Sequence, residues 1–426
     1  MASGRCRHRI GWRRRRFWLP FGKRKTADIT FPLAPTFKAH EIDAVHGEAI
    51  HLDLADKTVT TSAGVHGYDY LVIATGYRND HTVVPGLGPG GNAHGTTILE
   101  DAIRADEGWR RLLTAPGDIV VGATQGAGCF GAAYEFLFNV AHQLRRAGLN
   151  KQVKLSFVTP EPFLGHFGIG GLPHAESLLG MFMRKEGIAS CTDVGIERVE
   201  KGRLLLADGR AVELAYAMVV PPFLAQEVVR AAARIADRGS RIADRGWQGL
   251  SHRIKVRGTY QTEAYDDVYA VGIAAAVSVP RQTSTPLGTP KTGCPTERMA
   301  HVAARNIAAQ IRGEQPRAHE ELGDMPAVCV MDAGNSGVSI LADKMLPPRK
   351  HGVLIPGPPA HATKLAFERY FLWKARHGYV SLPSGRPRDV PAGSCPAPGL
   401  ADRSAQLTPS TSRAGQLRGH LRLQSP

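Results

Sequence analysis

The sequence lacks the features of a chain that crosses or passes through a membrane. Its 426 residues contain no run of about eighteen consecutive apolar residues, so we predict no transmembrane helix. Its first residues are positively charged, but no apolar stretch of roughly 7–15 residues follows them, so we predict no signal peptide. Six cysteines in a chain of this length are too few for a disulfide scaffold.

Acidic residues are scarce at both ends of the chain. The formal net charge is +15, yet residues 26–380 are almost neutral, with 37 basic and 36 acidic residues. Residues 1–25 hold ten Lys and Arg and no acid, and residues 381–426 hold six Arg and two Asp. The central region has no patch in which cations and aromatic residues alternate, so we expect basic tails and no nucleic-acid partner. The last segment is rich in Pro, Ser, Gly and Arg and is expected to be disordered.

The central region alternates strand and helix patterns, which is typical of an α/β fold of two or three domains. Short apolar runs predict buried strands at 68–74, 118–123, 153–159 and 267–273. Helical periodicity predicts helices at 100–113, 132–144, 172–186 and 296–312. Three further segments are predicted to be antiparallel strands that close one domain: 203–207, 211–214 and 217–221.

A glycine-rich turn between a predicted strand and a predicted helix is the most informative segment. Four glycines occur at or after the end of the strand: Gly122, Gly126, Gly128 and Gly131. In this context glycines let the backbone approach a dinucleotide pyrophosphate at the helix N-terminus. Cys129 lies inside the turn, where its side chain would crowd a phosphate and where a helix N-terminus favours the reactive thiolate. Cys129 can equally be a small buried apolar residue.

A second cysteine lies 200 residues further along the chain. Cys329 belongs to a predicted strand that runs into a turn rich in Asp, Gly and Asn. Two cysteines that are distant in sequence can meet in the folded protein as a redox pair. Cys129 and Cys329 are therefore the candidate catalytic pair, and we predict no metal site.

Several motifs together resemble the sulfide:quinone oxidoreductases. These are flavoproteins with two dinucleotide-binding domains, related to type II NADH dehydrogenases and flavocytochrome c sulfide dehydrogenases. The resemblance rests on residues 68–76, 129–136, 165–171, 269–273, 290–293 and 367–374 and on the block around Cys329, in the family's order between about Gly11 and Val380. The blocks around Cys129, His166 and Cys329 are the specific ones.

The resemblance implies FAD as the cofactor, sulfide as the substrate and a membrane quinone as the electron acceptor, with polysulfide or sulfur as the product. It makes Cys129 and Cys329 the redox pair. Sulfide would attack one sulfur to form a persulfide, and the released thiolate would pass two electrons to the flavin. His166 is implied as an acid/base or electrostatic partner near sulfide, although a turn histidine bonded to the backbone fits the same pattern.

Further site residues are carried by the same resemblance. Six residues are placed at the flavin: Thr75, Gly76, Gly272, Ile273, Lys291 and Gly293. Lys291 would lie near the pyrimidine edge, unless it is a surface lysine. Lys364 and Phe367 are the quinone-binding candidates. Their segment is amphipathic and aromatic, which suits a helix lying on a lipid surface, although an ordinary packing helix is the alternative. We therefore expect a peripheral membrane protein that can form a homo-oligomer.

The resemblance also predicts the domain organisation, with two Rossmann-like domains and C-terminal amphipathic membrane-binding helices. The expected parts are a basic, non-family segment (1–25), an FAD-type domain (26–115 and 260–345), a second dinucleotide-type domain (116–259), a membrane and quinone segment (346–380) and a disordered tail (381–426). The family opens with a Gly-x-Gly-x-x-Gly loop that this sequence lacks, so we expect an N-terminally truncated first domain without its first βαβ unit.

The sequence leaves two alternative interpretations of the function open. The chain can be a non-catalytic remnant without stable FAD, because the first glycine loop is missing. It can also resemble a type II NADH:quinone oxidoreductase in function, although Cys129 in the loop for NADH argues against this.

The seven residues 234–240 are repeated almost unchanged at 241–247, which we interpret as a loop expansion.

Overall fold

The computed structural model describes residues 9–11, 18–236, 253–277, 283–291 and 293–377. The expected disordered tail and most of the duplicated heptads lie outside these residues. Within the described ranges, no helix combines the length and the apolar character that spanning a bilayer would require.

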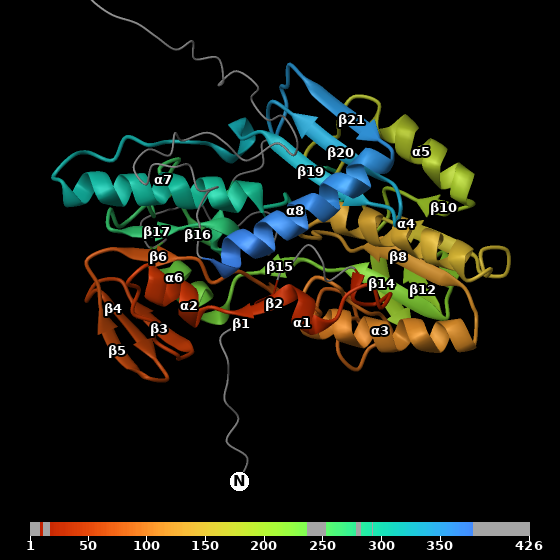
Figure 1. Ribbon diagram of the computed structural model, residues 1–426, viewed down its shortest axis with the longest axis horizontal. Coiled ribbons are helices and arrows are strands. Elements are labelled where there is room, and N and C mark those ends of the chain that lie inside the picture. The colour runs from red at the N-terminus through yellow and green to blue at the C-terminus, as the bar shows by residue number, and fades with distance from the viewer. Residues whose placement is uncertain (1–8, 12–17, 237–252, 278–282, 292, 378–426) are drawn as a thin grey trace, which may run out of the picture.

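A parallel four-stranded sheet forms the centre of the second dinucleotide-type domain. Its strand order is β10 (Ala189–Cys191), β9 (Leu155–Val158), β8 (Ile119–Ala123) and β14 (Tyr216–Val220). The helices around it are α3 (Leu99–Thr114), α4 (Phe130–Arg146) and α5 (Ala175–Glu186). The helix and strand patterns of the sequence thus correspond to an α/β domain (Figure 1).

The prediction that residues 217–221 form an antiparallel strand is wrong. This segment is β14, which pairs in parallel with β8, and all five residues of each strand are buried. Burial on both faces is what a parallel strand between helices requires. The antiparallel sheet consists instead of β11 (Ile196–Glu200), β12 (Arg203–Leu206) and β13 (Ala211–Glu213).

Two separate stretches of the chain, which the sequence predicts to be the FAD-type domain, form a second unit. β6 (Leu71–Ile73) pairs in parallel with β17 (Val268–Ala270), and α7 (Cys294–Ile311) runs beside them (Figure 1). The remaining elements are β3 (Ala49–Asp53), β4 (Thr58–Thr61), β5 (Gly64–Gly67), α6 (Glu227–Ala236), β16 (Ile254–Lys255) and β18 (Ala275–Ala276). A short antiparallel pair links the two domains, β7 (Arg78–Asn79) with β15 (Phe223–Leu224).

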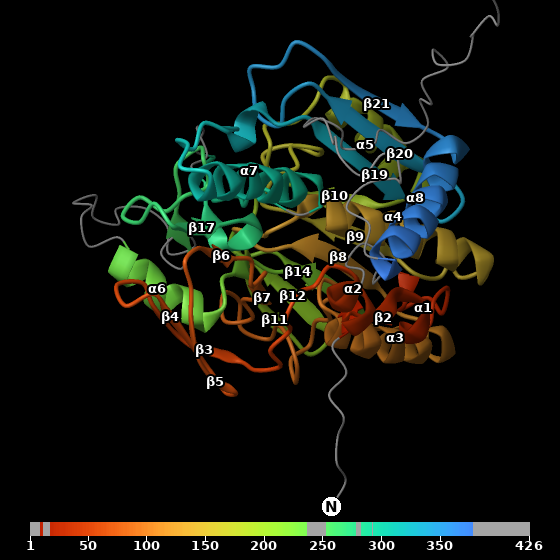
Figure 2. The ribbon, with the colours of Figure 1, turned by 60° about the vertical axis from the view of Figure 1, so that its left-hand side comes forward.

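An antiparallel sheet and a long helix complete the fold. The sheet has the order β19 (Ala327–Asp332), β20 (Gly337–Ala342) and β21 (Gly352–Pro356), so β19 lies at one edge. α8 (Pro358–Arg376) packs on this sheet, and α4 packs on β19 (Figure 2). The edge strand β19 therefore lies between helices from two different parts of the sequence.

Residues 18–25 of the basic segment, which we call the N-terminal strap, pack into the core. They lie between β1 (Arg9–Gly11) and a turn of short elements, α1 (Thr26–Ile29), β2 (Thr30–Pro32) and α2 (Ala34–Ala39). Trp18 is 2% exposed, and its Nε1 donates a hydrogen bond to Asp332 of β19 (2.9 Å). Arg24 binds Glu368 of α8 through two nitrogens, at 3.1 and 3.0 Å. This part of the segment is thus not a solvated tail.

The packing of the strap predicts that substitution of its aromatic residue Phe21 strongly lowers the stability of the protein. Phe21 stacks on Phe136 and meets Trp109 edge-on, with ring centroids 5.1 Å apart in both cases. Phe21→Ala should lower the free energy of unfolding by about 2–3 kcal/mol, somewhat less than a fully buried phenylalanine because Phe21 is half-buried. Urea unfolding measures the difference. Val65→Ala, at a 65% exposed position, is the control, and equal losses in both variants would contradict the packing of the strap.

Candidate functional site

Cys129 lies at the start of α4, directly after the glycine-rich turn. It is the N-cap residue of that helix and has an extended backbone. The turn has no room for side chains, since a Cβ on Gly128 would lie 2.1 Å from the Phe223 ring. This geometry places the half-buried sulfur at the positive end of the α4 dipole, which favours a thiolate.

Cys329 faces the same apolar cluster from β19. Side chains alternate along the strand, so that Cys329, its β20 partner Ile340 and Met331 point toward the core. Cys129 borders the same cluster. The two elements are close, because a Cβ on Gly131 of α4 would lie 3.8 Å from the Met331 sulfur. The fold therefore brings both cysteines to one buried region.

His166 lies on a loop that packs against this region. Its neighbours Leu164, Phe167 and Ile169 belong to the cluster that the two cysteines border. The Nδ1 atom of His166 is buried and has no hydrogen-bond partner among the residues that the structure describes. Burial, and secondarily the charge of Arg349, lower the pKa of the imidazole. A neutral ring with an open nitrogen can accept a proton from a small acid.

Beneath this loop lies a buried network that the sequence did not indicate. Glu161 is fully buried and accepts hydrogen bonds from Tyr134, Thr159 and the amide of Phe167. Burial raises the pKa of Glu161 to about 7, and the three donors oppose this rise. Sequence patterns could not show that these residues meet, because Tyr134 lies on α4 and Glu161 follows β9 in another part of the chain.

Four of the flavin candidates lie where β6 and β17 end. The Val271 amide donates to the Ile73 carbonyl (3.1 Å), so the residues after the two strands are adjacent: Thr75, Gly76, Gly272 and Ile273. Gly272 has a φ of +65°, and a Cβ there would come within 3.1 Å of Thr296. Ile273 is buried in the cluster that both cysteines border. Ligands bind α/β sheets at such carboxyl ends of parallel strands.

Lys291 and Gly293 lie at the beginning of α7, next to the strand ends. Lys291 is 4% exposed and its ammonium group donates to the Ala275 carbonyl, so the surface-lysine interpretation is wrong. Burial lowers the pKa of Lys291 well below its ordinary value. Gly293 is the N-cap residue of α7, with a φ of +70°. A buried amine and a helix N-terminus together favour an electron-rich ligand.

The glycine-rich turn is closed by another part of the chain. The amide of Gly126 donates to the Pro286 carbonyl at 2.7 Å, and those of Ala127 and Gly128 donate to Thr124 and Pro221. Gly288 is so close that a Cβ on it would lie 2.3 Å from the Ala127 carbonyl. Three backbone donors that a pyrophosphate could use, the amides of Gly126, Ala127 and Gly128, are therefore bonded within the protein.

Lys364 is buried between α8, α4 and β19. Its ammonium group lies 2.8 Å from both carboxylate oxygens of Glu135 and 2.8 Å from the Val330 carbonyl, next to Cys329 in the sequence. Its side chain is 4% exposed and that of Glu135 is 6% exposed. Phe367, the other quinone candidate, packs against a neighbouring cluster that contains Leu19 and Leu372. The two candidates thus border different clusters.

Two further ion pairs hold the inward face of α8. His361 bonds through Nδ1 to Asp332, whose side chain is completely buried, and Glu368 binds Arg24 of the strap. His361, Lys364 and Glu368 recur at helical spacing, so one face of α8 is polar and charge-paired. This face is not the solvated face of an ordinary amphipathic helix.

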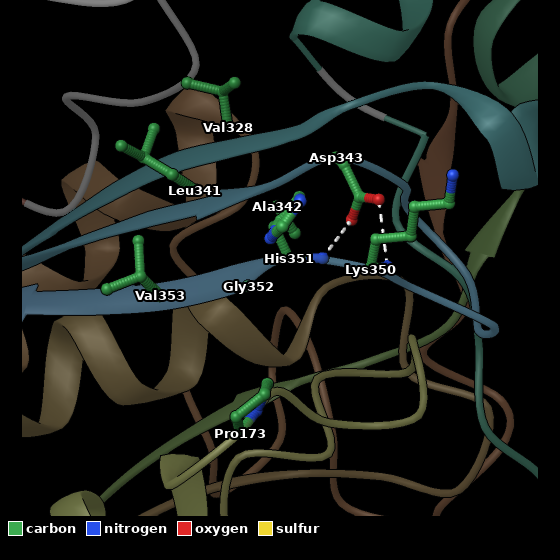
Figure 3. Close-up of a pocket in the computed structure, with 9 residues that line it drawn as sticks. All are labelled: Pro173, Val328, Leu341, Ala342, Asp343, Lys350, His351, Gly352 and Val353. Carbon is green, nitrogen blue, oxygen red and sulfur yellow. Dashed lines mark hydrogen bonds between the residues drawn. The ribbon is translucent and has the colours of Figure 1, made fainter.

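A pocket lies at the end of the β19–β20–β21 sheet where the chain passes from β20 to β21. Figure 3 shows Val328, Leu341 and Val353 on adjacent strands, pointing away from Pro173. Asp343 accepts hydrogen bonds from the amides of Lys350 and His351 at one end of the pocket (Figure 3). None of the predicted catalytic or cofactor residues lines this pocket, so it is separate from the cysteine region.

The segment expected to lie on lipid exposes only part of its apolar surface. Phe367 and Phe371 are half-buried against the core, whereas Trp373 is 40% exposed. On the neighbouring β21, Val353 is 48% and Ile355 is 46% exposed. The exposed apolar residues of this segment thus lie on two elements, the strand β21 and the helix α8.

Comparison with known proteins gives one relative of high similarity. No protein-family model matches the sequence. A sulfide-quinone reductase from Aquifex aeolicus is 33% identical over 85% of this chain and 82% of its own length. A type II NADH:quinone oxidoreductase from Staphylococcus aureus is 24% identical over 76% of this chain and 78% of its own.

Solved structures agree with this comparison. The sulfide:quinone oxidoreductase of Aquifex aeolicus superposes with a TM-score of 0.80 and 31% identity, over 88% of this chain and 85% of the other. NDH2 from Plasmodium falciparum shares the fold, with a TM-score of 0.63 and 11% identity over 87% and 90% of the two chains. The α/β fold with two dinucleotide-type domains is thereby confirmed.

The buried pair of Lys364 and Glu135 predicts that the loss of one partner strongly destabilises the protein. Replacing the second partner as well should restore part of the stability. Lys364→Met removes the cation and leaves the Glu135 carboxylate buried without it, so the free energy of unfolding should fall by about 3–5 kcal/mol. The double variant Lys364→Met/Glu135→Gln should recover much of this loss. Urea unfolding of the two single variants and the double variant measures the coupling, and strictly additive losses would show that the pair does not act as a unit.

Proposed function

Because this chain belongs to the sulfide:quinone reductase family, we propose that it is an FAD-dependent enzyme that oxidises sulfide to polysulfide or sulfur and passes the electrons to a membrane quinone. One observation carries the proposal. Two cysteines that are 200 residues apart border the same buried cluster, and Ile273 of the candidate flavin site belongs to that cluster.

The residues present fit a flavin ring. Gly272 offers a backbone approach that a side chain would close, the buried amine of Lys291 offers a hydrogen-bond donor, and the N-terminus of α7 offers partial positive charge beside it. The candidates that would hold FAD are Thr75, Gly76, Gly272, Ile273, Lys291 and Gly293. When bound, FAD supplies an acceptor for two electrons that can later release them to a quinone.

Cys129 and Cys329 would carry out the sulfur chemistry when they are bridged. A hydrosulfide ion attacks one bridge sulfur and a sulfur–sulfur bond breaks, so that one cysteine becomes a persulfide and the other leaves as a thiolate. The thiolate, at Cys129, is stabilised by the N-terminus of α4. Bound FAD would supply the acceptor for the two electrons that are released when the thiolate and the persulfide join, which restores a bridge with one more sulfur. His166 takes the proton of the hydrosulfide at its open nitrogen.

Lys364 and Glu135 fit the quinone side of the reaction. Reduction of a quinone to a quinol consumes two protons, and these two groups can hold protons in a buried place beside β19. Phe367 offers an aromatic surface on the same helix. We propose Lys364 and Phe367 as quinone-binding residues.

The closed glycine-rich turn weighs against NADH as the electron donor. A dinucleotide would need the amides that Gly126, Ala127 and Gly128 give to carbonyls of this chain. Opening the turn would also require residues 286–288 to move away from it. Sulfide, which is small, needs no such space.

We further propose that the protein lies on the membrane surface. Val353, Ile355 and Trp373 form the exposed apolar surface of residues 346–377, and cationic residues such as Lys374 and Arg376 lie nearby in the sequence. Apolar side chains flanked by cations suit the interface of an anionic bilayer.

Substitution of the cysteines tests the sulfur chemistry. Cys129→Ser and Cys329→Ser should each slow sulfide-dependent bleaching of the flavin absorbance by more than about 100-fold, because neither leaves a complete redox pair. Stopped-flow absorbance, with quinone added afterwards to restore the colour, measures this. Cys191→Ser changes a half-buried thiol on β10 and should react normally. Equal loss in Cys191→Ser would identify the wrong pair, and a colourless protein that FAD cannot reconstitute would favour the non-catalytic remnant.

Charged substitutions on β21 test membrane binding. Val353→Asp/Ile355→Asp should weaken binding to vesicles of anionic phospholipid at least about ten-fold, because two side chains lose their apolar contact with lipid. Sedimentation with vesicles gives the bound fraction. Ile311→Asp, at a 68% exposed position on α7, is the matched control. Unchanged binding of the double variant would place the lipid contact elsewhere.

A further inference from the structure

Glu161 and Tyr134 form a hydrogen-bonded pair that reaches both neighbours of His166. The Tyr134 hydroxyl donates to Glu161 at 2.9 Å. The amide of Phe167 donates to the other carboxylate oxygen at 2.6 Å, and the amide of Gly165 donates to the Tyr134 hydroxyl at 2.9 Å. The residues on either side of His166 are therefore bound to one buried pair.

The loop needs such anchors because its backbone is unusual. Gly165 has a φ of +82°, and Phe167 has a φ of +56°, in the left-handed region that residues with side chains rarely adopt. Such a conformation persists where surrounding contacts hold it. The short hydrogen bond from Phe167 to Glu161 supplies one of these contacts. Thr159 donates to the same carboxylate at 2.8 Å and fixes it in turn.

The pair connects the loop to the helix of the candidate nucleophile. Tyr134 lies on α4, five residues after Cys129, and both Tyr134 and Glu161 are completely buried. On the opposite side of the loop, a Cβ on Gly168 would lie 3.4 Å from the Phe130 ring. The pair therefore adds hydrogen bonds to the contact between the loop and the beginning of α4.

The backbone of His166 is fixed while its ring keeps an open nitrogen. Its carbonyl accepts hydrogen bonds from the amides of Ile169 and Gly171, and its ring lies edge-on to Phe163 at 5.3 Å. Nδ1 is buried and unpartnered among the described residues. The loop thus fixes the position of one buried ring nitrogen that keeps its hydrogen-bonding capacity.

We propose that Glu161 and Tyr134 are positioning residues, which hold the loop of His166, and with it the imidazole, beside the cluster that Cys129 borders. This proposal rests on the proposed function of the cysteine site. The pair touches neither substrate nor cofactor and acts only through His166. A displacement of about 1 Å in a catalytic group can lower a rate roughly 100-fold.

Kinetics of the two half-reactions test the proposal in the FAD-loaded enzyme. Glu161→Gln and Tyr134→Phe should slow the sulfide half-reaction by about 10- to 100-fold and leave the KM for quinone unchanged. The matched controls are Asp101→Asn, which changes another buried carboxylate, and Tyr216→Phe, which removes another buried hydroxyl. Both controls should react with sulfide normally. An equal loss in the controls, or a raised KM for quinone, would overturn the proposal.

A double variant separates positioning from a purely structural role. If the pair acts through His166, Glu161→Gln should add no further loss of sulfide rate to His166→Ala. Additive losses would overturn the proposal. Tyr134→Phe with His166→Ala repeats the measurement with a milder change, in case Glu161→Gln does not fold.

Hydrogen exchange gives a readout that does not depend on activity. The amides of Gly165 and Phe167 should exchange at least about ten-fold faster in Glu161→Gln and Tyr134→Phe, and at unchanged rates in the two controls. If the unmodified enzyme fails to react with sulfide, the proposed function fails, and this exchange pattern still tests the anchoring of the loop. Unchanged exchange at both amides would overturn the anchoring itself.

Discussion

A single buried ammonium group joins the three elements on which the candidate site depends. Lys364 of α8 reaches Glu135 of α4 and the Val330 carbonyl of β19. β19 is an edge strand, and such a strand presents a row of carbonyls without strand partners. The Asp332 carbonyl, two residues along, accepts from Asn139 of α4. Polar side chains of α8 and α4 thus donate hydrogen bonds to carbonyls of β19, the edge strand that carries Cys329. Since α4 begins at Cys129, the same contacts connect the two elements that carry the cysteines.

The second dinucleotide-type domain shows how one architecture serves different electron donors. Its parallel sheet, glycine-rich turn and following helix have the form of a dinucleotide-binding unit. Here the amides of the turn are bound to the chain itself, and residues 286–288 lie over them. The positive end of α4, which would otherwise meet a phosphate, instead lies at a sulfur atom. A few internal hydrogen bonds therefore distinguish this turn from one that is open to a dinucleotide.

Much of the fold could be predicted because local patterns determine it. Strong periodicity predicted helices at 100–113 and 132–144, and α3 and α4 extend these by one or two residues at each end. β10 and β11 were missed because they are short and partly exposed, so that their apolar pattern is weak. β14 was assigned the wrong direction, since strand orientation depends on its neighbours and not on its own residues. The network of Glu161 could not be predicted either, because its partners come from separate elements that only the folded chain brings together.

The contacts of the N-terminal strap also constrain how the polypeptide matures. Trp18 and Asp332 are 314 positions apart, and Arg24 and Glu368 are 344 apart. At a translation rate of roughly 5–20 residues per second, about 17–70 s pass between synthesis of Arg24 and of its partner. For most of that interval Trp18 of a nascent chain lacks its partner Asp332, although Phe21 can already pack against Trp109 and Phe136. Synthesis of β19 and α8 therefore completes the burial of Trp18, so the ribosome-bound intermediate is the stage at which this side chain most needs a chaperone.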